Sequence, residues 1–153
     1  LTDCEETAAQ GMVAFLDAHG AALGDDAVYV VLDQVGAGCL TWLTVDGLIV
    51  KRETRPRALD LARRAATALP DVETWARPGV AYTDAAVATK RGLAALTLSS
   101  IPVAEGGDEA HWHQMSDTPE VVNPDSLADA CAFSWQVLQA VDDDEKAYHI
   151  DLS

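Results

Sequence analysis

Helical stretches with one apolar face alternate with short apolar runs along this chain, and that alternation limits the fold more than any other feature. Apolar residues recur at helical spacing over residues 5–23, 58–69, 83–91 and 123–142. The β-rich runs between them cover residues 27–32, 40–45, 48–51 and 94–98. The runs 40–45 and 48–51 flank Asp46-Gly47, which is typical of a hairpin turn. We therefore expect an α/β fold, a three-layer αβα sandwich around a mixed, mainly parallel sheet.

Prolines, glycines and one asparagine mark the predicted helix ends. Pro56 and Pro70 bracket the second helix, and Gly92 follows the third. Asn123 and Pro124 form an N-cap and first helical position for the last helix. We expect residues 1–142 to belong to one domain and residues 143–153 to form a loose acidic tail.

Composition excludes several classes of partner. The chain has 25 acidic and 10 basic residues and a formal charge of −15, so it would repel nucleic acid and anionic membrane surfaces. The longest apolar runs are far shorter than the roughly 20 residues of a membrane-spanning helix. Three cysteines without a Cys-x-x-Cys spacing predict neither a disulfide framework nor a thiolate zinc site. Because the chain begins at Leu1, both cytoplasmic and secreted locations stay open.

Three places combine metal-binding or acid–base side chains with the ends of predicted elements. Glu5 and Glu6 stand at a helix start, and Asp33 closes an apolar strand. The third place is a polar loop that contains His111 and His113. Each has a plain structural interpretation: charge at a first turn, an aspartate that bonds its own backbone, and an incidental histidine pair.

The joint pattern is more specific than its parts. Its four pieces follow one another in the order Glu5-Glu6 with Gly11, Leu32-Asp33-x-Val35-Gly36, Tyr82-Thr83-Asp84 before Gly92, and His113-x-x-x-Asp117-Thr118-Pro119. In this order and spacing the sequence resembles the co-catalytic zinc aminopeptidases, whose relatives include glutamate carboxypeptidases and glutaminyl cyclases. The resemblance runs from Cys4 to Asp142. It implies a zinc exopeptidase, most simply an aminopeptidase, with peptide substrates and two zinc ions in the complete site.

The resemblance also implies roles for particular residues. Glu5 would be the general base that takes a proton from the attacking water. Glu6 and His113 would hold one zinc, and Asp33 the other. Carboxylate and imidazole are ligands that zinc accepts, and a nearby carboxylate can move the proton.

Four further residues have weaker roles by the same resemblance. Thr83 and Asp84 would lie near the substrate end of the pocket. Asp117 and Thr118 would hold the loop of the metal-binding histidine in shape.

The sequence departs from the family in one main respect. A histidine ligand and a bridging aspartate precede the Glu-Glu pair in the family, in a His-x-Asp pattern, and only three residues precede Glu5 here. We therefore interpret the chain as the C-terminal portion of a catalytic domain, with three of five zinc ligands and inactive alone. Self-association, or pairing with a missing N-terminal half, would cover the open sheet edge.

Two alternatives stay open. A non-catalytic relative could keep the fold as a binding or interaction module. A glutaminyl cyclase with a single zinc would keep catalysis but convert N-terminal glutamine.

Overall fold

The computed structural model describes residues 2–79, 82–101, 111 and 113–151. The helical elements are η1 (Glu5–Thr7), α1 (Gln10–Leu23), α2 (Pro56–Ala68), α3 (Asp84–Lys90), η2 (Pro119–Val121) and α4 (Pro124–Asp151). The strands are β1 (Val28–Leu32), β2 (Cys39–Asp46), β3 (Arg52–Glu53), β4 (Thr74–Pro78) and β5 (Ala94–Ile101). Among the described helices, none is both long and apolar enough to cross a bilayer.

The five described strands form one mixed sheet. Strand β5 pairs in parallel with β1, with Val30 opposite Leu96, and antiparallel with β2, with Thr41 opposite Ser99. Strand β2 also pairs in parallel with β4 and antiparallel with β3. The mixed sheet predicted from the sequence is confirmed, with parallel and antiparallel pairings side by side.

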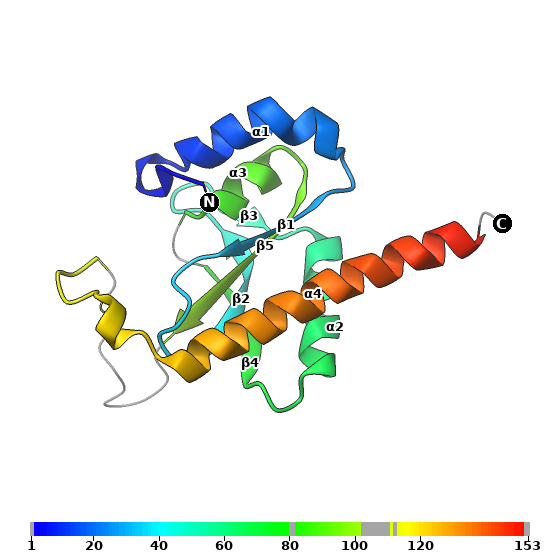
Figure 1. The fold of residues 1–153 in the computed structure, drawn as a ribbon. Helices are drawn as coiled ribbons and strands as arrows, with labels where there is room; N and C mark the ends of the chain where they lie inside the picture. Colours follow the sequence, from blue (N-terminus) through cyan, green and yellow to red (C-terminus); the bar gives the residue numbers. More distant parts are fainter. Residues whose placement is uncertain (1, 80–81, 102–110, 112, 152–153) are drawn as a thin grey trace.

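Helices cover both faces of this sheet (Figure 1). Helices α2 and α4 pack with the even-numbered residues of β5, Leu96 and Leu98, in the larger hydrophobic core. Helices α1 and α3 pack with Ala95 on the opposite face. Successive side chains of a strand point to opposite faces, so one strand serves both cores. The predicted three-layer αβα sandwich is confirmed.

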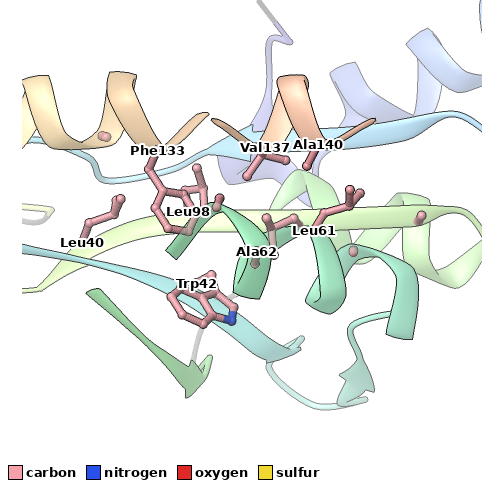
Figure 2. Close-up of a cluster of buried hydrophobic side chains, with 13 residues drawn as sticks. Leu40, Trp42, Leu61, Ala62, Leu98, Phe133, Val137 and Ala140 are labelled. Carbon is pink, nitrogen blue, oxygen red and sulfur yellow. The ribbon is translucent and has the colours of Figure 1, made fainter. Parts of the chain in front are cut away.

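The larger core is built around Phe133 of α4. The Phe133 ring is fully buried and stacks on Trp42 of β2, with ring centroids 5.6 Å apart. Figure 2 shows Leu40 and Leu98 from the sheet beside it, and Leu61 from α2 in the same cluster. Burial of a side chain of this size stabilises the fold by about 2–3 kcal/mol relative to an exposed one. This core fixes α2 and α4 on the sheet.

The capping signals act locally as the sequence predicts. The Asn123 side-chain oxygen accepts hydrogen bonds from the backbone N–H of Asp125 at 2.9 Å and of Ser126 at 3.2 Å, which caps α4. The Thr83 hydroxyl accepts from the Ala85 N–H at 3.2 Å and caps α3. Gly92 follows α3 with φ of +84°, a conformation that suits glycine at a helix end.

The predicted hairpin exists as an antiparallel pair, but its second strand is not the one predicted. Residues 48–51 are not a strand, and Ile49 is 97% exposed at the tip of the connection. The paired residues are instead Arg52 and Glu53. An apolar run predicts a strand only where a neighbour covers it, and nothing among the described residues covers this tip. Strand β4 was not predicted at all.

The first helix is broken where the sequence predicts continuity. Residues 5–7 form the 3-10 turn η1, and Ala8 and Ala9 take left-handed conformations with φ of +63° and +53° before α1 begins. Left-handed residues cannot continue a right-handed helix. The two glutamates therefore stand on a separate turn and not on α1.

Helix α4 continues to Asp151, through most of the segment 143–153 that the sequence analysis treats as a tail. No proline or glycine interrupts residues 142–151, so nothing local ends the helix.

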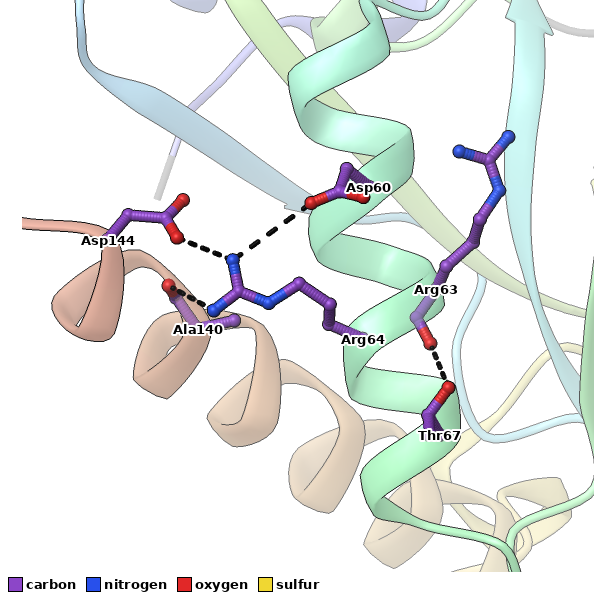
Figure 3. A network of polar contacts seen from close by, with 6 residues as sticks. All are labelled: Asp60, Arg63, Arg64, Thr67, Ala140 and Asp144. Carbon is purple, nitrogen blue, oxygen red and sulfur yellow. Dashed lines mark hydrogen bonds and ion pairs between the residues drawn. The ribbon is translucent and has the colours of Figure 1, made fainter. Parts of the chain in front are cut away.

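Arg64 of α2 forms polar contacts with α4 (Figure 3). Its guanidinium donates to the Asp144 carboxylate at 2.5 Å and to the Ala140 carbonyl at 3.2 Å. Strand β5 extends to Ile101, three residues beyond the predicted run 94–98. In the loop that follows, residues 102–110 and 112 lie outside the described part of the chain.

Candidate functional site

A close backbone approach positions the Glu5-Glu6 pair. A side chain at Gly11 would place its Cβ 1.9 Å from the Asp3 carbonyl oxygen, so only glycine lets the N-terminal segment lie against α1. Cys4 turns the chain into η1 through a left-handed conformation, with φ of +58°. The glycine of the sequence motif therefore has a physical reason: it holds the turn that carries both glutamates.

Asp33 extends from the sheet at the end of β1. Its N–H donates to the Leu98 carbonyl at 3.0 Å, so its backbone belongs to the ladder between β1 and β5. Gln34 then takes a left-handed conformation with φ of +56°, and the Ser100 N–H donates to the Gln34 carbonyl at 3.1 Å. A non-glycine residue in this conformation costs free energy, and such residues gather at functional sites.

Glu6 and His113 meet although 107 positions separate them in the sequence. Nε2 of His113 lies 2.9 Å from Oε1 of Glu6, and both side chains are exposed. His113 also takes a left-handed conformation, with φ of +58°. The other histidine of the pair, His111, places Nδ1 2.8 Å from the Ser116 hydroxyl. The two histidines of the loop thus have different partners.

Thr83 and Asp84 are buried at the start of α3. Asp84 is 6% exposed, and its Oδ2 accepts a short hydrogen bond from the Thr2 hydroxyl. Its Oδ1 is buried and has no hydrogen-bond partner among the described residues. A buried carboxylate oxygen without a partner is costly, so a hydrogen-bond donor or a cation next to this atom would be favourable.

One buried carboxylate was missed by the sequence analysis. Asp46, at the end of β2, is 3% exposed. It accepts hydrogen bonds from the Thr83 N–H at 3.1 Å, the Thr83 hydroxyl at 2.5 Å and the Thr97 hydroxyl at 3.2 Å. Like Asp33, Asp46 closes an apolar strand, and this position could have indicated a site residue. Gly47, which follows it, favoured the interpretation of a turn instead.

Burial and neighbouring carboxylates raise the pKa values of Glu5 and Asp33. Burial, and then the charges of Asp33, Glu6, Asp84 and Asp46, raise the pKa of Glu5 to about 7. Burial, and then Asp46, Asp84 and Glu6, raise the pKa of Asp33, while His113 lowers it. The side chains that η1, α3 and the ends of β1 and β2 carry are therefore close enough for electrostatic interaction. The shared repulsion makes this place favourable for a cation.

Asp117 and Thr118 shape the end of the His113 loop. The Asp117 N–H donates to the Gln114 carbonyl at 3.0 Å in a turn. A hydrogen bond from the Thr118 hydroxyl lowers the pKa of Glu120. Thr118 also precedes η2 as its N-cap. The structure describes neither residue in contact with the Glu5-Glu6 turn.

The donor types fit zinc, but the donor number in the described part of the chain is short of a closed site. Glu6 and His113 bring a carboxylate oxygen and an imidazole nitrogen to one place, and zinc accepts both types of ligand. Among the described residues, no group of three or more histidine, cysteine, aspartate or glutamate side chains could hold a metal ion. Zinc takes four ligands, so further ligands would have to come from residues outside this group.

Comparison with known proteins identifies the relatives of this chain. A sequence model of peptidase family M28 matches residues 1–138. A zinc aminopeptidase from Bacillus subtilis, called BSAP, is 18% identical with a TM-score of 0.67, and the match covers 84% of this chain and 32% of that one. An aminopeptidase from Aneurinibacillus sp. strain AM-1 is 24% identical with a TM-score of 0.56, over 84% and 30% of the two chains.

A third structure shares the fold without a peptidase name. It is the Campylobacter jejuni 5'-methylthioadenosine/S-adenosyl homocysteine nucleosidase, 10% identical with a TM-score of 0.56, over 85% of this chain and 76% of that one. At these identities the structural matches show the fold alone. No curated protein matches the chain. The chain spans about a third of the length of the two aminopeptidases.

Proposed function

The chain belongs to peptidase family M28, and we propose from this that it forms part of a zinc-dependent exopeptidase, an aminopeptidase that removes N-terminal residues from peptides. One observation carries the proposal. Glu6 and His113, 107 positions apart in the sequence, meet at 2.9 Å beside Glu5, whose pKa is raised to about 7. A carboxylate with that pKa can take up and release a proton near neutral pH.

The proposed roles follow from chemistry and position. Glu6 and His113 would hold one zinc ion, and Asp33 would hold a second. When bound, zinc would polarise the scissile carbonyl and lower the pKa of the attacking water. Glu5 accepts the proton of that water on its carboxylate and returns it to the leaving amine, so it ends the cycle in its starting state.

Buried hydrogen bonds hold the start of α3 in place. Asp46 holds Thr83 by two hydrogen bonds, and Thr83 caps the helix that presents Asp84. We propose Thr83 and Asp84 as the substrate end of the pocket. Asp117 and Thr118 would hold the His113 loop through the turn and cap described above.

The test is a mass-spectrometric assay of the full-length protein, supplied with zinc, on three matched peptides. One peptide has both ends free, one has an acetylated N-terminus, and one has an amidated C-terminus. We expect the free and amidated peptides to lose N-terminal residues and the acetylated peptide to stay intact. Cleavage of the acetylated peptide from its C-terminus would instead indicate a carboxypeptidase.

Variants connect this activity to the site. Glu5→Gln keeps size and shape but cannot accept the proton, so we expect loss of at least about 100-fold in kcat. His111→Ala is the matched control, because His111 bonds Ser116 and not Glu6. An active Glu5→Gln enzyme would contradict the proposed role of Glu5. A substrate with N-terminal glutamine that loses 17 mass units, about that of ammonia, without hydrolysis would indicate a cyclase.

A further inference from the structure

A second feature lies apart from the carboxylates. A cavity of about 850 Å³ opens between the end of β2, strand β3, the start of α2 and the end of α3. Its wall contains four basic residues, Lys51, Arg52, Arg55 and Arg63, and one acidic residue, Glu53. None of Glu5, Glu6, Asp33 and His113 lines it. We call this cavity the basic pocket.

The charge of the basic pocket is unusual for this chain. Four of the ten lysines and arginines line one cavity in a protein of formal charge −15. Arg57, Arg64 and Arg91 have aspartate partners within 4.0 Å. The four basic side chains of the pocket, by contrast, have no ion pair with any described carboxylate. The pocket therefore gathers positive charge that no ion pair among the described residues neutralises.

The start of α2 adds to this positive field. The helix of 13 residues begins with Pro56, and no side chain caps it. Its first N–H groups therefore lack intrahelical partners, and its dipole is positive at this end. Leu59 and Arg63 stand one turn apart on the side that lines the pocket. Figure 3 shows the Arg63 side chain leaving α2 on the side opposite to Arg64.

We propose that the basic pocket binds a small soluble anion that carries two or more phosphate groups. Three guanidinium groups present planar pairs of donors, which match phosphate oxygens better than a lysine does. The cavity volume lies within the range of small-molecule sites, about 300–1,000 Å³. Both features favour a compact, multiply charged ligand.

The negative charge of the whole chain favours a small anion over a large one. A polyanion or an anionic membrane would meet the 25 acidic residues as well as the pocket. A small anion inside the pocket meets mainly the local field, because salt screens charges beyond about 8 Å under physiological conditions. The strongly acidic composition thus argues against nucleic acid and lipid, and for a small ligand.

The experiment titrates sodium pyrophosphate into the isotope-labelled full-length protein and follows the backbone amides by NMR. Sodium chloride at matched ionic strength is the parallel titration. We expect saturable shifts at Thr54, Arg55 and Thr89, which line the pocket. Shifts confined to Glu6 and Asp33 would report metal withdrawal by pyrophosphate and would overturn the pocket assignment.

Two variants on the same helix region make the test specific. Arg55→Gln combined with Arg63→Gln should weaken pyrophosphate binding about tenfold or more, since two charge-assisted hydrogen-bonding groups are lost. Arg57→Gln combined with Arg64→Gln removes the same two charges from α2, but these side chains pair with Asp26 and Asp144 and do not line the pocket, so binding should change less than about twofold. Equal weakening by both changes would mean a general charge effect and would overturn the proposal.

A second experiment distinguishes a soluble phosphate compound from a lipid headgroup. The protein is mixed with vesicles of phosphatidylglycerol in phosphatidylcholine and recovered by flotation. We expect no binding, because the acidic surface repels the vesicle. Flotation that depends on Arg55 and Arg63, without a pyrophosphate response, would assign the pocket to a lipid headgroup and overturn the soluble anion.

Discussion

Replacement of Glu5 by glutamine should make the metal-free protein more stable while it removes the proposed base. In the absence of metal, Glu5 is partly buried and faces the charges of Asp33, Glu6 and Asp84. The folded protein therefore holds a proton on Glu5 more tightly than the unfolded chain does. Above the folded pKa, the ionised Glu5 opposes folding, and a neutral glutamine of the same shape does not.

The pKa sets the size and direction of the effect. A rise from 4.5 to about 7 corresponds to about 3 kcal/mol for a group fully shielded from water. Glu5 is only partly buried, so screening by water reduces this to about 1–2 kcal/mol at pH 8. Below pH 4.5 Glu5 is protonated in both states, and its favourable contribution is fully present. The contribution is lost as the pH rises through about 7, so the gain from Glu5→Gln should grow between pH 5 and pH 8.

Thermal unfolding in the presence of a chelator measures this gain. At pH 8 we expect the midpoint of Glu5→Gln to lie about 3–6 °C above that of the unchanged protein, and at pH 5 to lie close to it. Glu120→Gln is the control, because a hydrogen bond from Thr118 lowers the pKa of Glu120, and its removal should bring no gain at pH 8. A gain for Glu5→Gln that is equal at pH 5 and pH 8, or a loss at pH 8, would refute the reasoning.

Three further predictions follow from packing and geometry. Gly11→Ala should push the Asp3 backbone away and displace the Glu5-Glu6 turn, so proposed activity should fall at least about tenfold while circular dichroism shows the helices retained. Phe133→Ala should lower the free energy of unfolding in urea by about 3–5 kcal/mol, because it empties the centre of the larger core. Arg64→Met should cost only about 0.5–1 kcal/mol in the same assay, since its ion pair with α4 is partly exposed; a loss above 2 kcal/mol would contradict that.

The parts of the fold that the sequence predicts correctly depend on local chemistry. Asn123 and Thr83 cap helices by hydrogen bonds to residues two or three positions ahead, and Gly92 ends α3 by its own backbone freedom. Such effects need no knowledge of the rest of the chain. The alternation of helices and strands likewise predicts the layers, because each apolar face must be covered.

The errors come from contacts between distant residues. The break at Ala8 and Ala9 accompanies the approach of Asp3 to Gly11, which helical periodicity does not reveal. The exposed residues 48–51 have a strand-like composition, but no neighbour in the described part of the chain covers them. In the site, the pairing of Glu6 with His113 spans 107 positions and was accessible only through family resemblance. The network of Asp46 with Thr83 and Thr97 depends on three elements meeting, and a local turn signal concealed it.

The most direct test of the central claim is the zinc content of the full-length protein and three variants, measured after dialysis at neutral pH. The account predicts bound zinc in the unchanged protein. In His113→Ala and Glu6→Ala the zinc affinity should fall at least about 100-fold, because removal of a residue that only hydrogen-bonds to a ligand already costs about 10- to 100-fold. His111→Ala should retain the zinc, since His111 bonds Ser116. Equal zinc content in the unchanged protein and in His113→Ala would contradict a metal centre built on Glu6 and His113.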